Sequence, residues 1–120
     1  MSFELAFWYE QPPPSADTAL EKYLKLAEGD SGVAAPHAAV GQFFDEVVEA
    51  YGDLKGEDAE RAPWVSPIYA TDECVILSLV GSRAPELVPR LLETAARNHL
   101  VAYDPQNRAV YSPSVGRLDP

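Results

Sequence analysis

The chain has 120 residues, which is enough for one domain with a hydrophobic core and too few for two. Hydrophobic residues make up 47% of it and charged residues 23%, a balance that excludes an intrinsically disordered chain. The formal net charge is −10, so we expect neither nucleic acid nor an anionic membrane surface as a partner.

The acidic charge is concentrated in the first half of the chain. Residues 1–60 contain 13 acidic and 3 basic side chains, whereas residues 61–120 contain 6 of each. An acidic half suits a basic protein partner, although solubility alone explains the same charge. The single cysteine, Cys74, lies in an apolar run, and neither a signal peptide nor a membrane-spanning stretch is visible. We therefore expect a cytoplasmic protein.

The first predicted elements are a strand and two helices. Residues 3–10 alternate between a strongly apolar face and a second face that carries Trp8, a candidate for a sheet-to-sheet contact. A helix capped by Ser15 or Asp17 follows and stops at Gly29. Its apolar positions are Leu20, Tyr23, Leu24 and Ala27. Pro36 opens a second helix that ends at Gly52, and its apolar face is Val40, Phe43, Phe44, Val47 and Tyr51.

The second half predicts a loop, two strands, a helix and a hairpin. Residues 54–67 read as an irregular loop with Trp64 held against the core. Residues 66–71 predict a short strand and residues 74–80 a buried central one. The third helix follows, and Pro89 either delays its start or kinks it. Its buried side is predicted as Leu87, Val88, Leu91, Leu92 and Ala95, and it ends near Asn98 and His99. A hairpin over residues 100–111 follows, and residues 112–120 are predicted to be a polar tail without regular structure.

This order predicts an α+β fold with a single domain over residues 1–120. If the first crossover is an αα-hairpin, the order matches the ferredoxin-like, split βαβ arrangement. Right-handed crossovers then place residues 3–10 and 74–80 centrally in an antiparallel sheet, with the helices on one face. The C-terminal hairpin adds one further strand.

Two groups of residues are candidate binding sites. The predicted second helix carries Asp45, Glu46 and Glu49 opposite its apolar face, and Asp53 follows it. These acids suit the arginines of a basic partner, although an ordinary solvated helix face has the same pattern. Ser82 and Arg83 form a weaker candidate for anion binding at the start of the third helix, where a simple turn and cap give the same sequence.

No catalytic, metal or cofactor motif is visible. Two histidines and one thiol without H-E-x-x-H spacing do not predict a zinc site, and no phosphate-binding glycine loop occurs. A Cys–His nucleophile pair needs an exposed thiol in an electropositive place, whereas Cys74 follows two acids and begins an apolar run. We therefore expect no catalytic residue, no metal and no cofactor. Several aromatic residues fall near predicted strands, where they form a core, a dimer face or an apolar ligand pocket. They are Phe3, Phe7, Trp8, Tyr9, Trp64, Tyr69, Tyr103 and Tyr111.

Two segments carry a resemblance to a known group. Residues 3–8, Phe-Glu-Leu-Ala-Phe-Trp, resemble the aromatic-acid-Leu-Ala-Val-Trp opening of a group of small, acidic, largely uncharacterised bacterial proteins. Residues 100–106, Leu-Val-Ala-Tyr-Asp-Pro-Gln, are similar to their C-terminal signature, in which His99 replaces the usual glycine. Members of this group are sometimes taken for immunity-type proteins that bind toxins, but the resemblance implies no established activity and transfers no catalytic residue.

Together these observations favour a small, non-catalytic, immunity-like protein-binding module that presents the acidic helix face to a basic partner. One alternative is a small-ligand protein or small enzyme with an aromatic-lined pocket and Arg83 as an anion anchor. Another is a homodimeric structural protein joined through an exposed sheet face.

Overall fold

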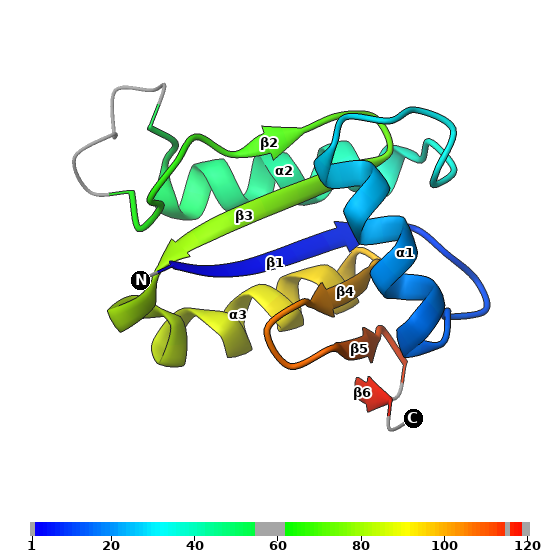
Figure 1. Cartoon of the computed structure of the whole chain (residues 1–120). Coiled ribbons are helices and arrows are strands. Elements are labelled where there is room, and N and C mark those ends of the chain that lie inside the picture. Colours follow the sequence, from blue (N-terminus) through cyan, green and yellow to red (C-terminus); the bar gives the residue numbers. More distant parts are fainter. Residues whose placement is uncertain (1, 55–61, 115, 119–120) are drawn as a thin grey trace.

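A computed structural model describes residues 2–54, 62–114 and 116–118, and these residues form one antiparallel sheet with three α-helices (Figure 1). The strand order is β2-β3-β1-β4-β5-β6. The strands are β1 (Ser2–Trp8), β2 (Tyr69–Ala70), β3 (Cys74–Val80), β4 (Val101–Asp104), β5 (Ala109–Ser112) and β6 (Gly116–Leu118). The α+β class and the interior positions of β1 and β3 are confirmed.

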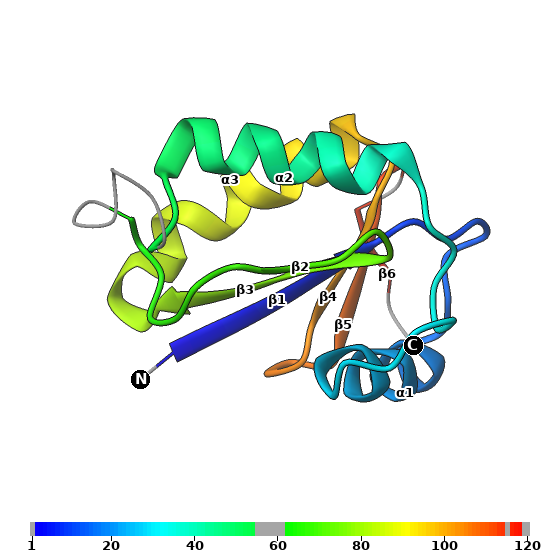
Figure 2. The same cartoon turned by 90° about the horizontal axis from the view of Figure 1, so that it is seen from above.

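The helices lie on both faces of the sheet, not on one. They are α1 (Ala16–Ala27), α2 (Ala38–Tyr51) and α3 (Ala84–Arg97), and the 3₁₀ turn η2 (Gly81–Arg83) precedes α3. Figure 2 shows α2 and α3 together on one face and α1 on the other. The prediction of an αα-hairpin in the first crossover is therefore wrong. The physical reason is that β1 has two apolar faces, and each needs a cover.

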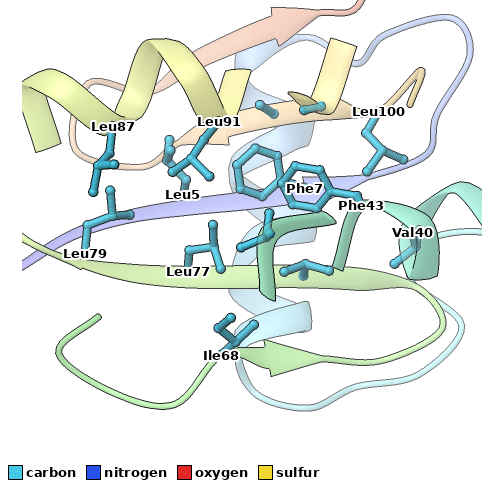
Figure 3. Close-up of a cluster of buried hydrophobic side chains, with 14 of the residues drawn as sticks. Leu5, Phe7, Val40, Phe43, Ile68, Leu77, Leu79, Leu87, Leu91 and Leu100 are labelled. Atoms are coloured by element: carbon cyan, nitrogen blue, oxygen red, sulfur yellow. The ribbon is translucent and has the colours of Figure 1, made fainter. Parts of the chain in front are cut away.

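One face of β1 builds the larger core. Leu5 and Phe7 are fully buried against α2 and α3, and the Phe7 ring lies 4.4 Å from the ring of Phe43 (Figure 3). In α3, Leu87 and Leu91 are buried as predicted. α3 begins five residues before Pro89 and continues through it, so this proline does not delay the helix.

The other face of β1 builds a second core under α1. Trp8 is fully buried there, and its ring centroid lies 6.3 Å from that of Tyr103. The Tyr103 ring also packs on the Tyr23 ring, with centroids 5.7 Å apart. Trp8 therefore contacts a helix-covered core rather than a second sheet. The Tyr103 hydroxyl is buried without a hydrogen-bond partner among the described residues, and burial raises the pKa of this phenol.

The buried face of α1 agrees with the predicted one only in part, because Leu20 and Tyr23 pack against the second core whereas Ala27 is exposed. Ala19 and Leu26, seven residues apart and thus two helical turns, point to the sheet, while Leu24 is 51% exposed. The small Ala19 side chain permits close approach to a sheet face already filled by Trp8 and Tyr103. Ser15 caps α1 by accepting from the Thr18 amide, and Gly29 follows its end with φ of 90°, as predicted.

The ends of α2 and α3 depend on two histidines. His37, not Pro36, starts α2: its Nδ1 atom accepts a hydrogen bond from the Ala39 amide at 3.0 Å. His99 follows α3 with φ of 61°, a conformation that usually requires glycine. The predicted glycine end of α2 is confirmed, because Gly52 has φ of 80°.

The segment between α2 and β3 is pinned by Trp64. Its indole is buried and donates a hydrogen bond to the Gly52 carbonyl at 2.8 Å, which confirms its predicted contact with the core. Residues 55–61 of the predicted loop lie outside the described residues. The predicted strand over residues 66–71 is shorter, because only Tyr69–Ala70 pair with β3.

The C-terminal hairpin is confirmed, and its turn reaches β1. The Asp104 carboxylate accepts hydrogen bonds from the backbone amides of Gln106 and Asn107, and these bonds close the turn. The Gln106 side chain then accepts from the Glu4 amide at 2.6 Å and donates to the Glu4 carbonyl at 2.9 Å. The Gln106 side-chain amide thus makes hydrogen bonds to the β1 backbone at Glu4, where β4 no longer pairs with β1.

The predicted tail contains a further strand. Gly116–Leu118 form β6, which pairs antiparallel with β5, so the expectation of an unstructured tail is wrong. The Ser114 amide donates to the Ser112 hydroxyl, which supports the turn between them. A strand of three residues is too short for its alternation to be recognised in the sequence.

A buried carboxylate holds the loop between α1 and α2. Glu73 accepts hydrogen bonds from the amides of Gly32, Val33 and Ala34, each at 2.9 Å. The bonds from Ala34 and Gly32 are the main reason that the pKa of Glu73 lies below its ordinary value of 4.5. The carboxylate therefore ties β3 to a loop that is distant in the sequence.

We predict that Glu73→Gln lowers the midpoint of thermal unfolding at neutral pH, because the amide offers these donors only one uncharged oxygen. The stabilisation by ionised Glu73 is full above the unfolded-state pKa and is lost as pH falls through the lower folded-state pKa. The difference between wild type and variant should therefore shrink below about pH 4.5. Glu93→Gln, on the exposed side of α3, is the control. A difference that does not vary with pH would contradict this role of Glu73.

We predict that Gln106→Ala lowers the free energy of unfolding by roughly 1–2 kcal/mol, because two hydrogen bonds to Glu4 are lost. Gln42→Ala, at an exposed position of α2, should change it by less than about 0.5 kcal/mol. Denaturant titration measures both values. Equal stabilities of the two variants would show that the Gln106 bridge contributes nothing.

Candidate functional site

The predicted acidic residues lie on the outer side of α2 and just after it. The apolar face of α2 enters the larger core through Val40, Phe43 and Val47, which turns the acidic positions outward. Asp45 and Glu49 are exposed, whereas Glu46 and Asp53 are partly buried. α2 contains no lysine or arginine, so this helix face has one sign of charge.

Two of the four acids also make contacts within the chain. Asp53 accepts a hydrogen bond from the Ile68 amide at 3.3 Å and so positions the segment before β2. Glu46 accepts a hydrogen bond from the Asn98 side chain at the end of α3. Asn98 is itself buried and donates to the Thr94 carbonyl at 2.9 Å, so it holds the Glu46 carboxylate at a fixed place between α2 and α3.

A hollow of about 430 Å³ lies between α2 and α3 beside these acids. Its lining includes Glu46, Val47, Glu49 and Tyr51 from α2, with Thr94 and Arg97 from α3. Val47 is buried, so the accessible apolar part of the lining is Tyr51 together with the exposed Ala50. The Tyr51 ring packs edge-on against Trp64, with ring centroids 6.1 Å apart. The rim carries carboxylates on the α2 side. We name this feature the α2–α3 groove.

One basic side chain already reaches the groove. The Arg97 Nη1 atom lies 3.7 Å from Glu46 Oε1, and Arg97 also donates from Nη2 to the Thr94 hydroxyl at 3.2 Å. The side chains of Arg97 and Glu46 are 61% and 41% exposed, so solvent screens this ion pair. The groove therefore has carboxylates on its α2 side and, on its α3 side, the Arg97 guanidinium, which makes only a weak ion pair with Glu46. Sequence reasoning found the acids of α2 and missed their pairing with α3.

The second predicted site is at η2. Ser82 and Arg83 are exposed, and the Arg83 Nε atom is paired with the Glu86 carboxylate three residues later. η2 makes no side-chain cap hydrogen bond. The guanidinium predicted to hold an anion is thus paired with a carboxylate of α3, and solvent screens this exposed pair as well.

The aromatic residues form the two cores rather than a pocket wall. Phe7, Trp8, Trp64 and Tyr103 are buried, and Phe3, Tyr9 and Tyr111 pack against the larger core. The surface hollows found among the described residues are lined by other side chains, such as those of the α2–α3 groove. Tyr69 is 40% exposed at the edge strand β2.

The remaining candidate groups are engaged locally. The Tyr9 ring stacks on the His37 imidazole, with centroids 3.9 Å apart. Cys74 is buried, and this burial raises the pKa of its thiol, which makes the sulfur a poor nucleophile. Burial, together with a hydrogen bond to Glu4, also raises the pKa of the Tyr23 phenol.

Neither a metal-binding cluster nor a membrane-spanning helix is found in the part of the chain that the structure describes. Within residues 2–54, 62–114 and 116–118, no three histidine, cysteine, aspartate or glutamate side chains gather closely enough to hold a metal ion. No helix in these ranges combines the length and hydrophobicity needed to cross a bilayer. No family model, curated protein or solved structure matches the chain.

Proposed function

We propose that the protein is a non-catalytic protein-binding module that presents the outer face of α2 to a basic partner. The observation that carries this proposal is the single sign of charge on that face. Asp45 and Glu49 are exposed on a helix without lysine or arginine, beside the α2–α3 groove. Complementary charge speeds the encounter of two proteins and rejects partners of the wrong sign.

The resemblance of residues 3–8 and 100–106 to small acidic bacterial proteins is consistent with an immunity-type role, in which the partner is a toxin. We propose this as the biological setting, with the cytoplasm as the compartment. The buried, free Cys74 thiol supports a reducing environment. The role needs no chemistry from the protein itself.

We propose that the scaffold is a ferredoxin-like, split βαβ core with additions. The order β2-β3-β1-β4 and the position of α2 and α3 on one face support this assignment. On this view α1 covers the second face, and β5 and β6 extend the sheet beyond β4. The acidic face then belongs to the first of the two crossover helices.

We predict that reversing the charge of Asp45 and Glu49 to lysine weakens binding of an oligo-arginine peptide by about tenfold, or roughly 1.4 kcal/mol. The matched control reverses Glu21 in α1 and Glu28 just after it, two exposed acids on the opposite side of the sheet. The control alters net charge equally and should cost less than about twofold. Titration calorimetry measures both.

Equal weakening by both double variants would show that only net charge acts, and would refute the assignment to α2. A wild-type protein that does not bind the peptide at all would contradict the proposed function.

A second candidate, self-association through a sheet face, is favoured by a separate observation. The large apolar side chains exposed among the described residues are Leu24, Val65 and Tyr69. Tyr69 pairs in register with Ile76, whose side chain lies in the α1-side core. Val65 is 50% exposed next to Trp64, whose indole enters the larger core and whose backbone bridges to Leu79 of β3. Figure 1 shows that α1 crosses only one end of this face.

For this candidate, multi-angle light scattering over a concentration series should give a dimer mass, and Val65→Glu should restore the monomer. A monomer mass at millimolar concentration would remove the candidate. Gln42→Glu, with the same charge change on the exposed side of α2, is the control.

A further inference from the structure

The α2–α3 groove combines two features that a single arginine side chain needs. The methylene stem of arginine packs on apolar surface, and its planar guanidinium pairs with carboxylates and stacks on aromatic rings. Ala50 and Tyr51 supply the accessible apolar and aromatic surface, and Glu46 and Glu49 supply the carboxylates. The groove volume of about 430 Å³ leaves room for one such side chain.

The Glu46 carboxylate is positioned before any partner arrives. Its Oε2 atom accepts from Asn98, so the carboxylate is anchored at one oxygen. Its Oε1 atom faces Arg97 Nη1 at 3.7 Å, which is beyond hydrogen-bond distance for a guanidinium and a carboxylate. Asn98 therefore holds Oε2 by a hydrogen bond, whereas Oε1 has the Arg97 guanidinium nearby without a hydrogen bond to it.

Arg97 is held loosely on its own side of the groove. It follows Thr94 by one turn of α3 and donates a hydrogen bond to that hydroxyl at 3.2 Å. More than half of its side chain is exposed, and exposed ion pairs contribute between nothing and about 1 kcal/mol. A ligand that offers Glu46 a closer guanidinium can therefore displace it at small cost.

We infer that the α2–α3 groove is an arginine-recognition site and that Arg97 is its internal competitor, which a partner's arginine displaces from Glu46. This inference rests on the proposed function, because it specifies which side chain of the basic partner is read. In the free protein, Arg97 lowers the affinity of the groove for weakly basic proteins. In the complex, Arg97 turns to solvent and the partner's guanidinium takes its place between Glu46 and Glu49.

The test compares Arg97→Gln with Arg90→Gln in the full chain, using an oligo-arginine peptide as the probe. Both variants remove one exposed positive charge from α3, but Arg90 lies seven residues earlier and outside the groove lining. Removing a competitor worth up to about 1 kcal/mol should raise the peptide affinity of Arg97→Gln by about twofold to fivefold relative to Arg90→Gln. An oligo-lysine peptide should gain less, because its ammonium groups form no planar, two-pronged pair.

The outcomes separate this inference from the proposed function. If wild type binds the peptide and both variants gain equally, the competitor role of Arg97 is refuted while the binding function stands. If wild type does not bind, the proposed function itself fails. An equal gain for oligo-lysine would show a general charge effect and overturn arginine recognition. Circular dichroism melting of both variants checks that α3 is intact.

Discussion

The fold depends on burying β1 on both of its faces. A strand with one apolar face needs one layer of cover, but Leu5 and Phe7 point one way while Ala6 and Trp8 point the other, and all are fully buried. Two helices cover one side of the sheet and a third covers the other (Figure 2). The position of α1, and with it the loop that leads into α2, follows from the need to cover Trp8.

Hydrogen bonds from polar side chains connect segments that the two cores do not hold together. Glu73 fixes the loop between α1 and α2 from a distance of 41 residues, and Gln106 bonds to β1 from 102 residues away. The Asn98 amide joins the end of α3 to Glu46. Each uses a side-chain group to satisfy backbone or carboxylate groups that no secondary structure reaches. The Asp-Pro-Gln turn, the most recognisable stretch of the sequence, is thus structural.

Much of the scaffold can be predicted from local patterns. The alternation of β1, the apolar run of β3 and the buried side of α3 are read from spacing alone, because each depends on residues close in sequence. The face of α1 is predicted only in part: Leu20 and Tyr23 pack on the core, but the choice between Leu24 and Leu26 depends on where Trp8 and Tyr103 lie. The strand β6 is too short to show a period.

The sequence predicts the α2 side of the candidate site but not the α3 side. The acids of α2 are apparent from their helical spacing, but their relation to Arg97 and Asn98 spans about 50 residues and needs the packing of α2 on α3. The distinction between exposed Asp45 and Glu49 and the anchored Glu46 comes only from that packing. Two neighbouring helices on the same face of the sheet, α2 and α3, therefore supply the parts of the groove, and the larger core positions both.

Because both cores share β1, we expect the sheet to unfold as one cooperative unit rather than one layer at a time. Native-state hydrogen exchange tests this claim most directly. The amides of Leu5, Ala6 and Phe7 should exchange only through global unfolding, with the same free energy as denaturant unfolding, while β2 and β6 open locally. Exchange of the β1 amides at a clearly lower free energy than global unfolding would contradict the account.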